Sequence, residues 1–358
     1  MRALVLESFG KLAVADLDEP SADADEVKVR IIATGICGSD LHGYSGANGR
    51  RAPGQVMGHE TVGVVSAVGP DVTRDDISPG TIVTVNPVVI PREGIEEFTG
   101  REQHHPEKWV LGVAQEVVSA FAEYIVVPER NVVPLPYTMP VLFGALVEPL
   151  AVAVNAVRRA GITKDDAVLV LGGGPIGQSV ILALQMAGVE RILVTEVLPE
   201  RRDLLTALGA TVINPTAEPV NEAVRRILGR PADAAIDAVG ASPTVNDALS
   251  SIKLGGRVCL VGMGQTELTI DAFSVSTAER SIVGSFTYAN SDFQAAADWL
   301  AGAPGKAALL ISRTVDMDGA DDAFRSLEEH PTSGKVLVVL TPSLVAEGVI
   351  AERNEVLT

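Results

Sequence analysis

An apolar run leads directly into a glycine-rich turn near the middle of this chain, reading Ala167-Val168-Leu169-Val170-Leu171-Gly172-Gly173-Gly174-Pro175-Ile176-Gly177. The uninterrupted apolar half is typical of a strand buried on both faces of a parallel sheet. Apolar residues at helical spacing follow the glycines, and they begin at Ile176. Pro175 suits the first helical turn, because the N–H that proline lacks would be unpaired there anyway. The stretch therefore predicts a strand, a tight turn and a helix in succession.

This succession is the context that a dinucleotide-binding turn requires. Gly172 allows the tight turn, Gly174 lets the backbone approach a pyrophosphate, and Gly177 permits close packing of helix on strand. The helix N-terminus then offers unpaired N–H groups to the phosphates. We therefore expect Gly172, Gly174, Pro175, Ile176 and Gly177 to form the cofactor loop.

An acidic residue ends the next predicted strand. Glu196 lies 196 − 177 = 19 residues after the last glycine of the loop. A carboxylate at this distance is expected to bind the hydroxyls of the adenosine ribose and to repel a 2′-phosphate, which favours NAD over NADP. Arg201 and Arg202 follow closely, either as the solvated face of a helix or as partners for such a phosphate.

The chain changes character at about residue 150. Before residue 150, short runs of alternating apolar and polar residues, bounded by Gly and Pro, predict a β-rich domain. After a predicted helix at Leu150–Arg159, strand-like and helix-like segments alternate. This alternation predicts a doubly wound α/β domain. With 358 residues two domains are expected. We assign residues 1–150 and 291–358 to the β-rich domain and 151–290 to the coenzyme domain, and we expect the final strand to rejoin the first. The predicted strands are Val27–Ile32, Thr81–Val85, Glu123–Val127, Ala167–Leu171, Arg191–Thr195, Ala234–Ala238, Arg257–Val261 and Lys335–Leu340.

Charge, hydropathy and cysteine content argue against several classes of protein for this chain. A net charge of −18 opposes binding to nucleic acid and to anionic membrane surfaces. No signal peptide is recognisable, and no uncharged apolar stretch reaches the roughly 18 residues of a membrane span. The two cysteines lie far apart and offer no disulfide framework, which fits the reducing cytoplasm.

Three residues in the first domain offer metal-binding atoms of different kinds. Cys37 lies 22 residues before His59, and Glu60 follows directly. A thiolate, an imidazole and a carboxylate suit zinc, and three protein ligands with an open fourth position make a catalytic site. The alternative is a buried apolar cysteine and a surface His-Glu pair. If the pair enters a strand, a turn or bulge is needed for both side chains to reach one metal, since strand neighbours point to opposite faces.

The whole chain resembles the zinc-dependent medium-chain dehydrogenases, in particular the polyol (sorbitol-like) and secondary-alcohol branch. The matching stretches are Gly35–Asp40, Gly58–Glu60, Glu148–Val152, the glycine loop and Gly284–Phe286. The resemblance implies a GroES-like catalytic domain, a Rossmann coenzyme domain and a homodimer or homotetramer. It also implies one catalytic zinc on Cys37 and His59, with Glu60 as third ligand.

The resemblance implies roles for four further residues. Glu148 stands where the family places a residue that binds zinc directly or through water; otherwise it is a carboxylate favoured by a helix N-terminus. Asp40 matches a carboxylate that fixes the tautomer of His59. Ser39 matches a hydroxyl beside the substrate oxygen, and His42 matches the outer end of a proton relay or is simply an exposed histidine.

The sequence departs from the family in two places. The stretch Asn86–Leu111, where relatives often carry a second zinc on four cysteines, contains no cysteine, so no Cys₄ site is expected. His104 and His105, with Glu102 and Glu107, offer an alternative metal site in this stretch, but adjacent histidines in a polar loop are expected to be exposed. Sorbitol-like enzymes have an arginine two places after Ser285, where this chain has Thr287. Since a hydroxyl does not replace a guanidinium, sorbitol itself is disfavoured as substrate.

The sequence thus predicts a zinc-dependent oxidoreductase that transfers a hydride between a small-molecule alcohol (a secondary alcohol, diol or polyol) and NAD. Zinc would acidify the hydroxyl as a Lewis acid. The proton would leave through Ser39 and His42, or by way of Glu60 or Glu148. The alternatives are a zinc-free quinone or enone reductase of the same superfamily and a non-catalytic NAD-binding sensor.

Overall fold

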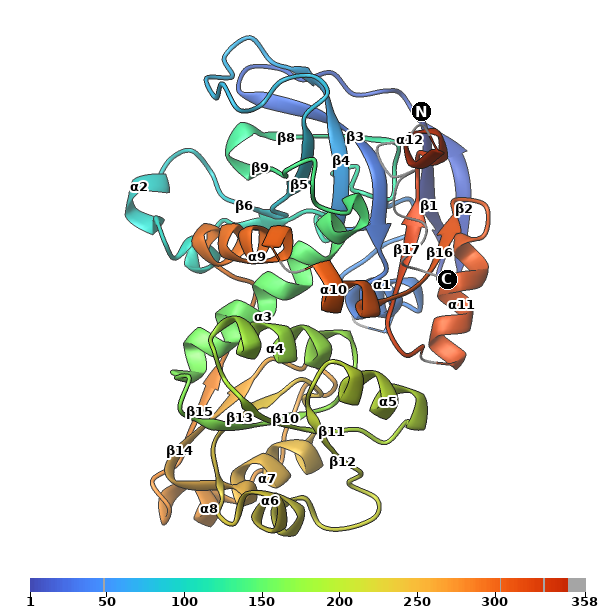
Figure 1. Ribbon diagram of the computed structural model, residues 1–358. Coiled ribbons are helices and arrows are strands. Elements are labelled where there is room, and N and C mark those ends of the chain that lie inside the picture. The colour runs from blue at the N-terminus through green and yellow to red at the C-terminus, as the bar shows by residue number, and fades with distance from the viewer. Residues whose placement is uncertain (48, 303, 331, 347–358) are drawn as a thin grey trace. The chain divides into compact units, whose positions relative to one another are not determined.

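The computed structural model describes residues 1–47, 49–302, 304–330 and 332–346. Two compact units divide the chain: one is Met1–Glu148 with the described residues from Phe293 onward, and the other is Pro149–Asp292. The last twelve residues of the range 291–358, which we assigned to the first domain, lie outside the described residues. Figure 1 labels the elements of both units.

The second unit is built on a wholly parallel sheet with the strand order β12-β11-β10-β13-β14-β15. This order, in which the first strand lies at the centre, is that of the dinucleotide-binding Rossmann fold. Figure 1 shows α4 and α5 on one side of the sheet and α6 and α7 on the other. The elements are β10 (Ala167–Leu171), α4 (Pro175–Met186), β11 (Arg191–Thr195), α5 (Pro199–Ala207), β12 (Thr211–Ile213), α6 (Val220–Leu228), β13 (Ala232–Asp237), α7 (Ser242–Ser251), β14 (Ile252–Leu260), α8 (Ala272–Ser276) and β15 (Ser281–Gly284).

The central strand β10 explains why the apolar run is uninterrupted. All five of its residues are buried, because helices cover both faces of the sheet and neighbouring strands flank both edges. The predicted doubly wound α/β fold is confirmed, and β10 and β11 begin and end at the predicted residues. Strand β14 begins five residues earlier than predicted, at Ile252 instead of Arg257. Lys253, Leu254 and Gly255 are exposed in that extension, so no apolar pattern marks it.

The first unit contains a mainly antiparallel sheet ordered β16-β17-β3-β4-β5-β9, with β8 also paired to β3. Strand β17 pairs antiparallel with β3, so the prediction that the last strand rejoins the first domain is confirmed. The elements are β1 (Arg2–Ser8), β2 (Lys11–Asp16), β3 (Glu26–Gly35), α1 (Gly38–Tyr44), β4 (Glu60–Val68), β5 (Ile82–Val85), β6 (Val88–Val89), α2 (Ile95–Phe98), η1 (Glu102–His104), β7 (Trp109–Val110), β8 (Tyr124–Pro128), η2 (Glu129–Asn131), β9 (Val132–Pro134), η3 (Val141–Leu146), α9 (Asn290–Gly302), α10 (Pro304–Ala307), η4 (Ala308–Leu310), β16 (Ile311–Asp316), α11 (Ala320–Glu329), β17 (Lys335–Val339) and α12 (Pro342–Ala346).

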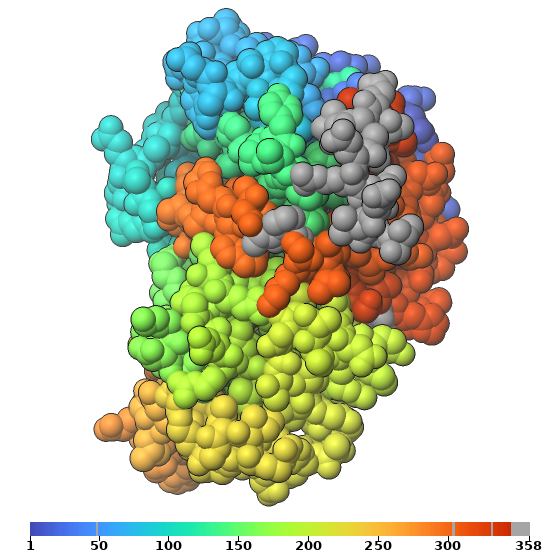
Figure 2. Space-filling view, in the orientation of Figure 1, coloured from blue at the N-terminus to red at the C-terminus, as the bar shows by residue number. Residues whose placement is uncertain are grey.

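A lobe without cysteine lies between β6 and β7, which pair with each other as a separate two-stranded sheet at its base. It stands out from the rest of the first unit in Figure 2, in cyan. The lobe is held by packing: the rings of Phe98 and His105 lie 4.7 Å apart, and the Gly100 N–H donates to Glu102. His105 is buried, which corrects the expectation that both histidines are exposed, because its ring packs against the ring of Phe98.

One helical stretch has the length and composition of a membrane span. It runs over η3 and α3 (Val147–Ala160) from Val141 to Ala160, with a mean hydropathy of 1.6. Its most apolar window is 78% buried inside the protein. This is the arrangement of a core helix, which needs apolar residues all round because it packs on several sides.

Candidate functional site

Three ligand atoms converge at one end of the sheet in the first unit. The Sγ of Cys37, a ring nitrogen of His59 and a carboxylate oxygen of Glu60 all lie within 4.8 Å of one another. Cys37 is half-buried, whereas His59 and Glu60 are buried. Among the described residues this is the group of His, Cys, Asp and Glu side chains that suits a metal ion.

Two glycines allow the convergence. Gly58 has φ +96°, so the chain turns just before His59, and Glu60 becomes the first residue of β4. This is the turn that the His-Glu pair needs for both side chains to face one point. Across the sheet Glu60 pairs with Gly35, where a Cβ would lie 2.2 Å from Glu60 Oε2. Gly35 therefore makes room for the carboxylate.

Asp40 connects two of the three candidate ligands. Its Oδ2 accepts a hydrogen bond from the Cys37 backbone N–H at 3.1 Å, which caps α1. Its Oδ1 lies 3.6 Å from His59 Nδ1, just beyond hydrogen-bonding distance. An Asp40 carboxylate facing Nδ1 leaves the other ring nitrogen, Nε2, for a metal.

Two buried cations, Arg51 and Lys335, lie beside these groups, and sequence reasoning missed both. Arg51 Nη2 is 3.9 Å from Asp40 Oδ1, and its side chain is 1% exposed. Lys335 Nζ donates to Glu60 Oε1 at 2.6 Å, and these side chains are 4% and 0% exposed. The signal for Lys335 was its place at the head of an otherwise apolar strand; no pattern marks Arg51 in its loop.

The electrostatics of the site reflect this crowding of charge. Burial alone would lower the pKa of His59, but Asp40 and Cys37 outweigh burial and hold that pKa well above its ordinary value. Burial likewise opposes the charge of Lys335, yet Glu60 and Cys37 raise the pKa of Lys335 above its ordinary value. His59 and Lys335 thus both favour the charged form in the metal-free protein.

The charged groups around the three candidate ligands carry a net negative charge. With Cys37 as a thiolate, the carboxylates ionised and His59 neutral, as zinc binding requires, four negative groups face two positive ones, an excess that one divalent cation would balance. Glu60 Oε2 is buried without a hydrogen-bond partner among the described residues. The donor atoms and the charge therefore fit zinc. The negative groups are Cys37, Asp40, Glu60 and Glu148, and the positive groups are Arg51 and Lys335.

The other candidate residues lie around this centre in different ways. Glu148 is buried, and its carboxylate contributes to raising the pKa of both His59 and Lys335, although it is outside the 4.8 Å set. Ser39 and His42 lie three residues apart on α1, which places them on the same face of the helix. Ser39 is half-buried and His42 exposed.

The glycine loop has the predicted geometry in the second unit. Gly172 has φ +90° directly after β10, as a tight turn requires. A Cβ on Gly177 would lie 1.9 Å from the Gly172 carbonyl oxygen, so only glycine fits. A Cβ on Gly174 would meet only Arg201 Nη1, at 3.7 Å, so its surroundings are open. Pro175 is the first residue of α4, and Ile176 follows it.

Glu196 lies beside this loop, directly after β11. Its Oε2 accepts from the Gly173 N–H at 3.1 Å, and its Oε1 accepts from the N–H groups of Val197 and Leu198. Arg201 Nη1 is 3.7 Å from Oε2. The structure thus brings the acidic residue and the glycine loop together, with an arginine within reach of both.

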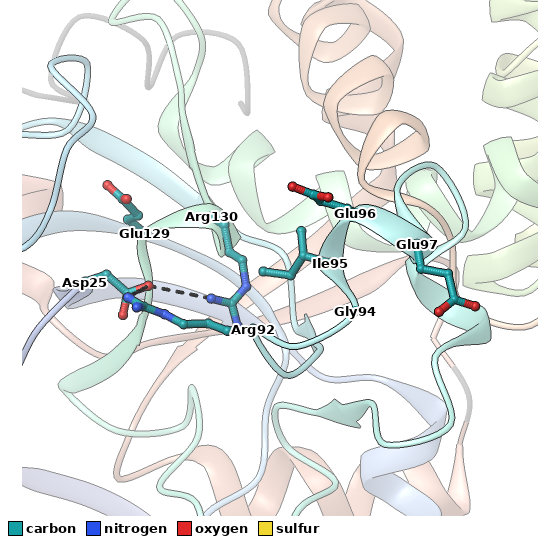
Figure 3. A pocket seen from close by; sticks show the side chains of 8 residues that line it. All are labelled: Asp25, Arg92, Gly94, Ile95, Glu96, Glu97, Glu129 and Arg130. Atoms are coloured by element: carbon teal, nitrogen blue, oxygen red, sulfur yellow. Dashed lines mark ion pairs between the residues drawn. The ribbon is translucent and has the colours of Figure 1, made fainter.

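A separate surface hollow in the first unit is drawn in Figure 3. Asp25 pairs there with Arg92 at 2.7 Å and lies 3.6 Å from Arg130. None of the candidate catalytic residues lines this hollow. Its arginines face an aspartate of the same wall, and we assign no function to it.

Comparison with known proteins agrees with both units. The alcohol dehydrogenase GroES-like domain matches residues 23–137, and the zinc-binding dehydrogenase domain matches residues 175–302. A probable D-xylulose reductase A of Emericella nidulans is 32% identical over 337 residues, which cover 91% of this chain and 93% of that protein. The crystal structure of 2R,3R-butanediol dehydrogenase from Bacillus subtilis is 27% identical, with a TM-score of 0.85 over 95% of this chain and 99% of the other. A short chain alcohol dehydrogenase from E. coli CFT073, solved with NADH, is 29% identical with the same TM-score and coverage.

Proposed function

Because the chain belongs to the zinc-dependent medium-chain dehydrogenase/reductase superfamily, in its polyol dehydrogenase branch, we propose that it oxidises an alcohol reversibly with NAD, at a zinc ion held by Cys37, His59 and Glu60. The observation that carries this proposal is the convergence of the three ligand atoms within 4.8 Å in a buried site with excess negative charge. Metal analysis of the purified protein tests it. About one zinc per chain is expected, and a protein that is active without any metal would contradict the site.

The residues around the proposed zinc ion have separate roles in holding the ligands and in moving the proton. A zinc ion held there would supply a Lewis acid for the substrate oxygen, and bound NAD would supply the hydride acceptor. Asp40 holds Cys37 through its backbone N–H and faces His59, so it fixes two ligands at once. Ser39 would accept the substrate proton at Oγ as it gives up its own toward His42, and the exposed ring of His42 would pass a proton to water. Glu148 supplies a further carboxylate close to the site.

We propose a secondary alcohol, a diol or a polyol other than sorbitol as the substrate. Relatives named as xylulose reductase and butanediol dehydrogenase support the alcohol class. Thr287 stands where sorbitol-like enzymes have an arginine, and its buried Oγ1 has no hydrogen-bond partner among the described residues. NADH formation from a panel of diols, polyols and secondary alcohols tests this choice, and sorbitol as the preferred substrate would contradict it.

Replacing Glu196 tests the coenzyme. Glu196→Ala removes the carboxylate that opposes a 2′-phosphate and leaves Arg201, 3.7 Å away, to bind one. We expect the ratio of kcat/KM with NADP to that with NAD to rise about tenfold or more, since 1.4 kcal/mol is a factor of ten. The exposed Glu190→Ala, on the same unit, is the matched control and should leave the ratio unchanged. An unchanged ratio in Glu196→Ala would sink the argument for NAD.

The stability of the metal-free and zinc-loaded proteins should diverge as pH rises. The pKa of His59 is raised above its ordinary 6.5, so its stabilising charge in the metal-free protein is complete below that pH and lost as pH rises through the raised pKa. Zinc needs the neutral imidazole, so zinc binding strengthens over the same range. Calorimetry at about pH 6 and about pH 8 should therefore show a wider gap between the two Tm values at the higher pH. A constant gap would contradict the assignment of His59.

Two rival functions leave the metal site unexplained. A zinc-free quinone or enone reductase and a non-catalytic NAD-binding sensor have no use for three convergent ligands, one of which is buried beside an ammonium. We further propose a cytoplasmic location, consistent with two unpaired cysteines, and a homodimer or homotetramer.

A further inference from the structure

Lys335 is buried where a lysine is costly. It begins β17, whose remaining residues are apolar, and its side chain is 4% exposed. Taking an ammonium and a carboxylate out of water costs more than their attraction usually returns, and well-packed apolar residues often stabilise a protein better at such positions. A contribution to stability therefore does not explain why Lys335 and Glu60 are buried as a pair.

The two carboxylate oxygens of Glu60 have different surroundings. Oε1 of Glu60 accepts from Lys335 Nζ at 2.6 Å. Oε2, on the other side, is buried without a hydrogen-bond partner among the described residues and is held near Gly35. The carboxylate thus has one oxygen occupied by a fixed cation and one available to a metal. Two cations that share a carboxylate repel each other, and burial strengthens that repulsion.

From this geometry we propose that Lys335 is a positioning residue that acts as an internal competitor of zinc for Glu60. The ammonium keeps the buried carboxylate balanced when the metal is absent, and it weakens the Glu60–zinc bond when the metal is present. Glu60 is thereby a ligand that can be exchanged, whereas Cys37 and His59 are fixed. The inference rests on the zinc site of the proposed function.

The test is the zinc affinity of Lys335→Met, measured by competition with a chelator. Removing the competing charge should raise the chelator concentration that strips half the zinc by about tenfold or more, the scale on which groups behind metal ligands act. The metal-free variant should also melt at a lower temperature than the unchanged metal-free protein, because Glu60 then lies buried without a cation. Lys335→Arg keeps the charge and should bind zinc as the unchanged protein does.

Matched variants separate this role from packing. Lys11→Met removes an exposed ion pair from the same unit and should leave both measurements unchanged. In the Glu60→Gln background the contested carboxylate is gone, so adding Lys335→Met there should leave zinc affinity unchanged, and a tenfold gain in that background would overturn the competition for Glu60. With Glu60 in place, zinc affinity that is unchanged or weaker on loss of Lys335 also overturns the inference. A lack of zinc in the unchanged protein overturns the proposed function instead, so the two failures are distinguishable.

Discussion

Cys37→Ser is expected to remove zinc from the protein and to lower turnover by about 10³-fold or more. Thiolate sulfur is a far stronger zinc ligand than a serine hydroxyl, and the loss leaves His59 and Glu60 as a pair. A Lewis acid contributes several kcal/mol to the stabilisation of developing charge, and each 1.36 kcal/mol is a factor of ten in rate. Metal analysis and kcat with the best alcohol of the panel measure both effects.

The second cysteine provides the matched control. Cys259 is buried in β14 of the other unit, and burial raises the pKa of its thiol to about 12, so it is inert. Cys259→Ser should keep its zinc and its turnover per folded molecule. NAD binding should persist in Cys37→Ser, because the glycine loop belongs to the second unit. Full zinc content in Cys37→Ser would show that the metal is held elsewhere.

Gly177→Ala is expected to abolish measurable NAD binding, whereas Gly174→Ala is expected to weaken it without unfolding the second unit. At Gly177 the added Cβ would lie 1.9 Å from a backbone oxygen, so β10, the turn and α4 must move apart. Overpacking costs about 1–3 kcal/mol where side chains can yield, and here the obstacle is backbone. At Gly174 the nearest atom is the end of a flexible arginine at 3.7 Å, so the methyl group fits.

This pair of alanines separates folding from binding. For Gly174→Ala we expect a Tm close to that of the unchanged protein and an NAD Kd about tenfold higher, because the methyl occupies space that the pyrophosphate needs. Calorimetry and NADH fluorescence titration measure the two quantities, and zinc content should be normal in both variants. Tight NAD binding by Gly177→Ala would contradict the assignment of this loop as the coenzyme site.

The parts of the fold that were predictable carry a local signal. The buried strand β10 is apolar throughout because both faces of its sheet are covered, and Gly172 and Gly177 occupy backbone positions that other residues do not tolerate. The zinc candidates were predictable because Cys37, His59 and Glu60 combine unusual ligand types within 24 residues.

The parts that were missed depend on contacts between distant residues. Lys335 meets Glu60 across 275 positions, and the pairings of β17 with β3 and of β3 with β4 bring them together. Arg51 lies in a loop without periodicity, so its burial against Asp40 has no sequence signature. His105 was expected to be exposed from its polar neighbours, yet its ring packs on Phe98. In each case the partner, not the residue type, decides the environment.

The pairing of β17 with β3 also has a consequence for the order in which the parts of the first sheet are synthesised. Domains generally fold as units while the chain emerges from the ribosome. Strand β17, which supplies the ammonium for Glu60, is translated after the entire coenzyme unit. Glu60 therefore lacks its ammonium partner during most of chain elongation. A nascent chain that stops before residue 335 should therefore already contain Cys37, His59 and Glu60 but no ammonium that competes with zinc for the carboxylate, so it should be able to bind the metal before synthesis ends.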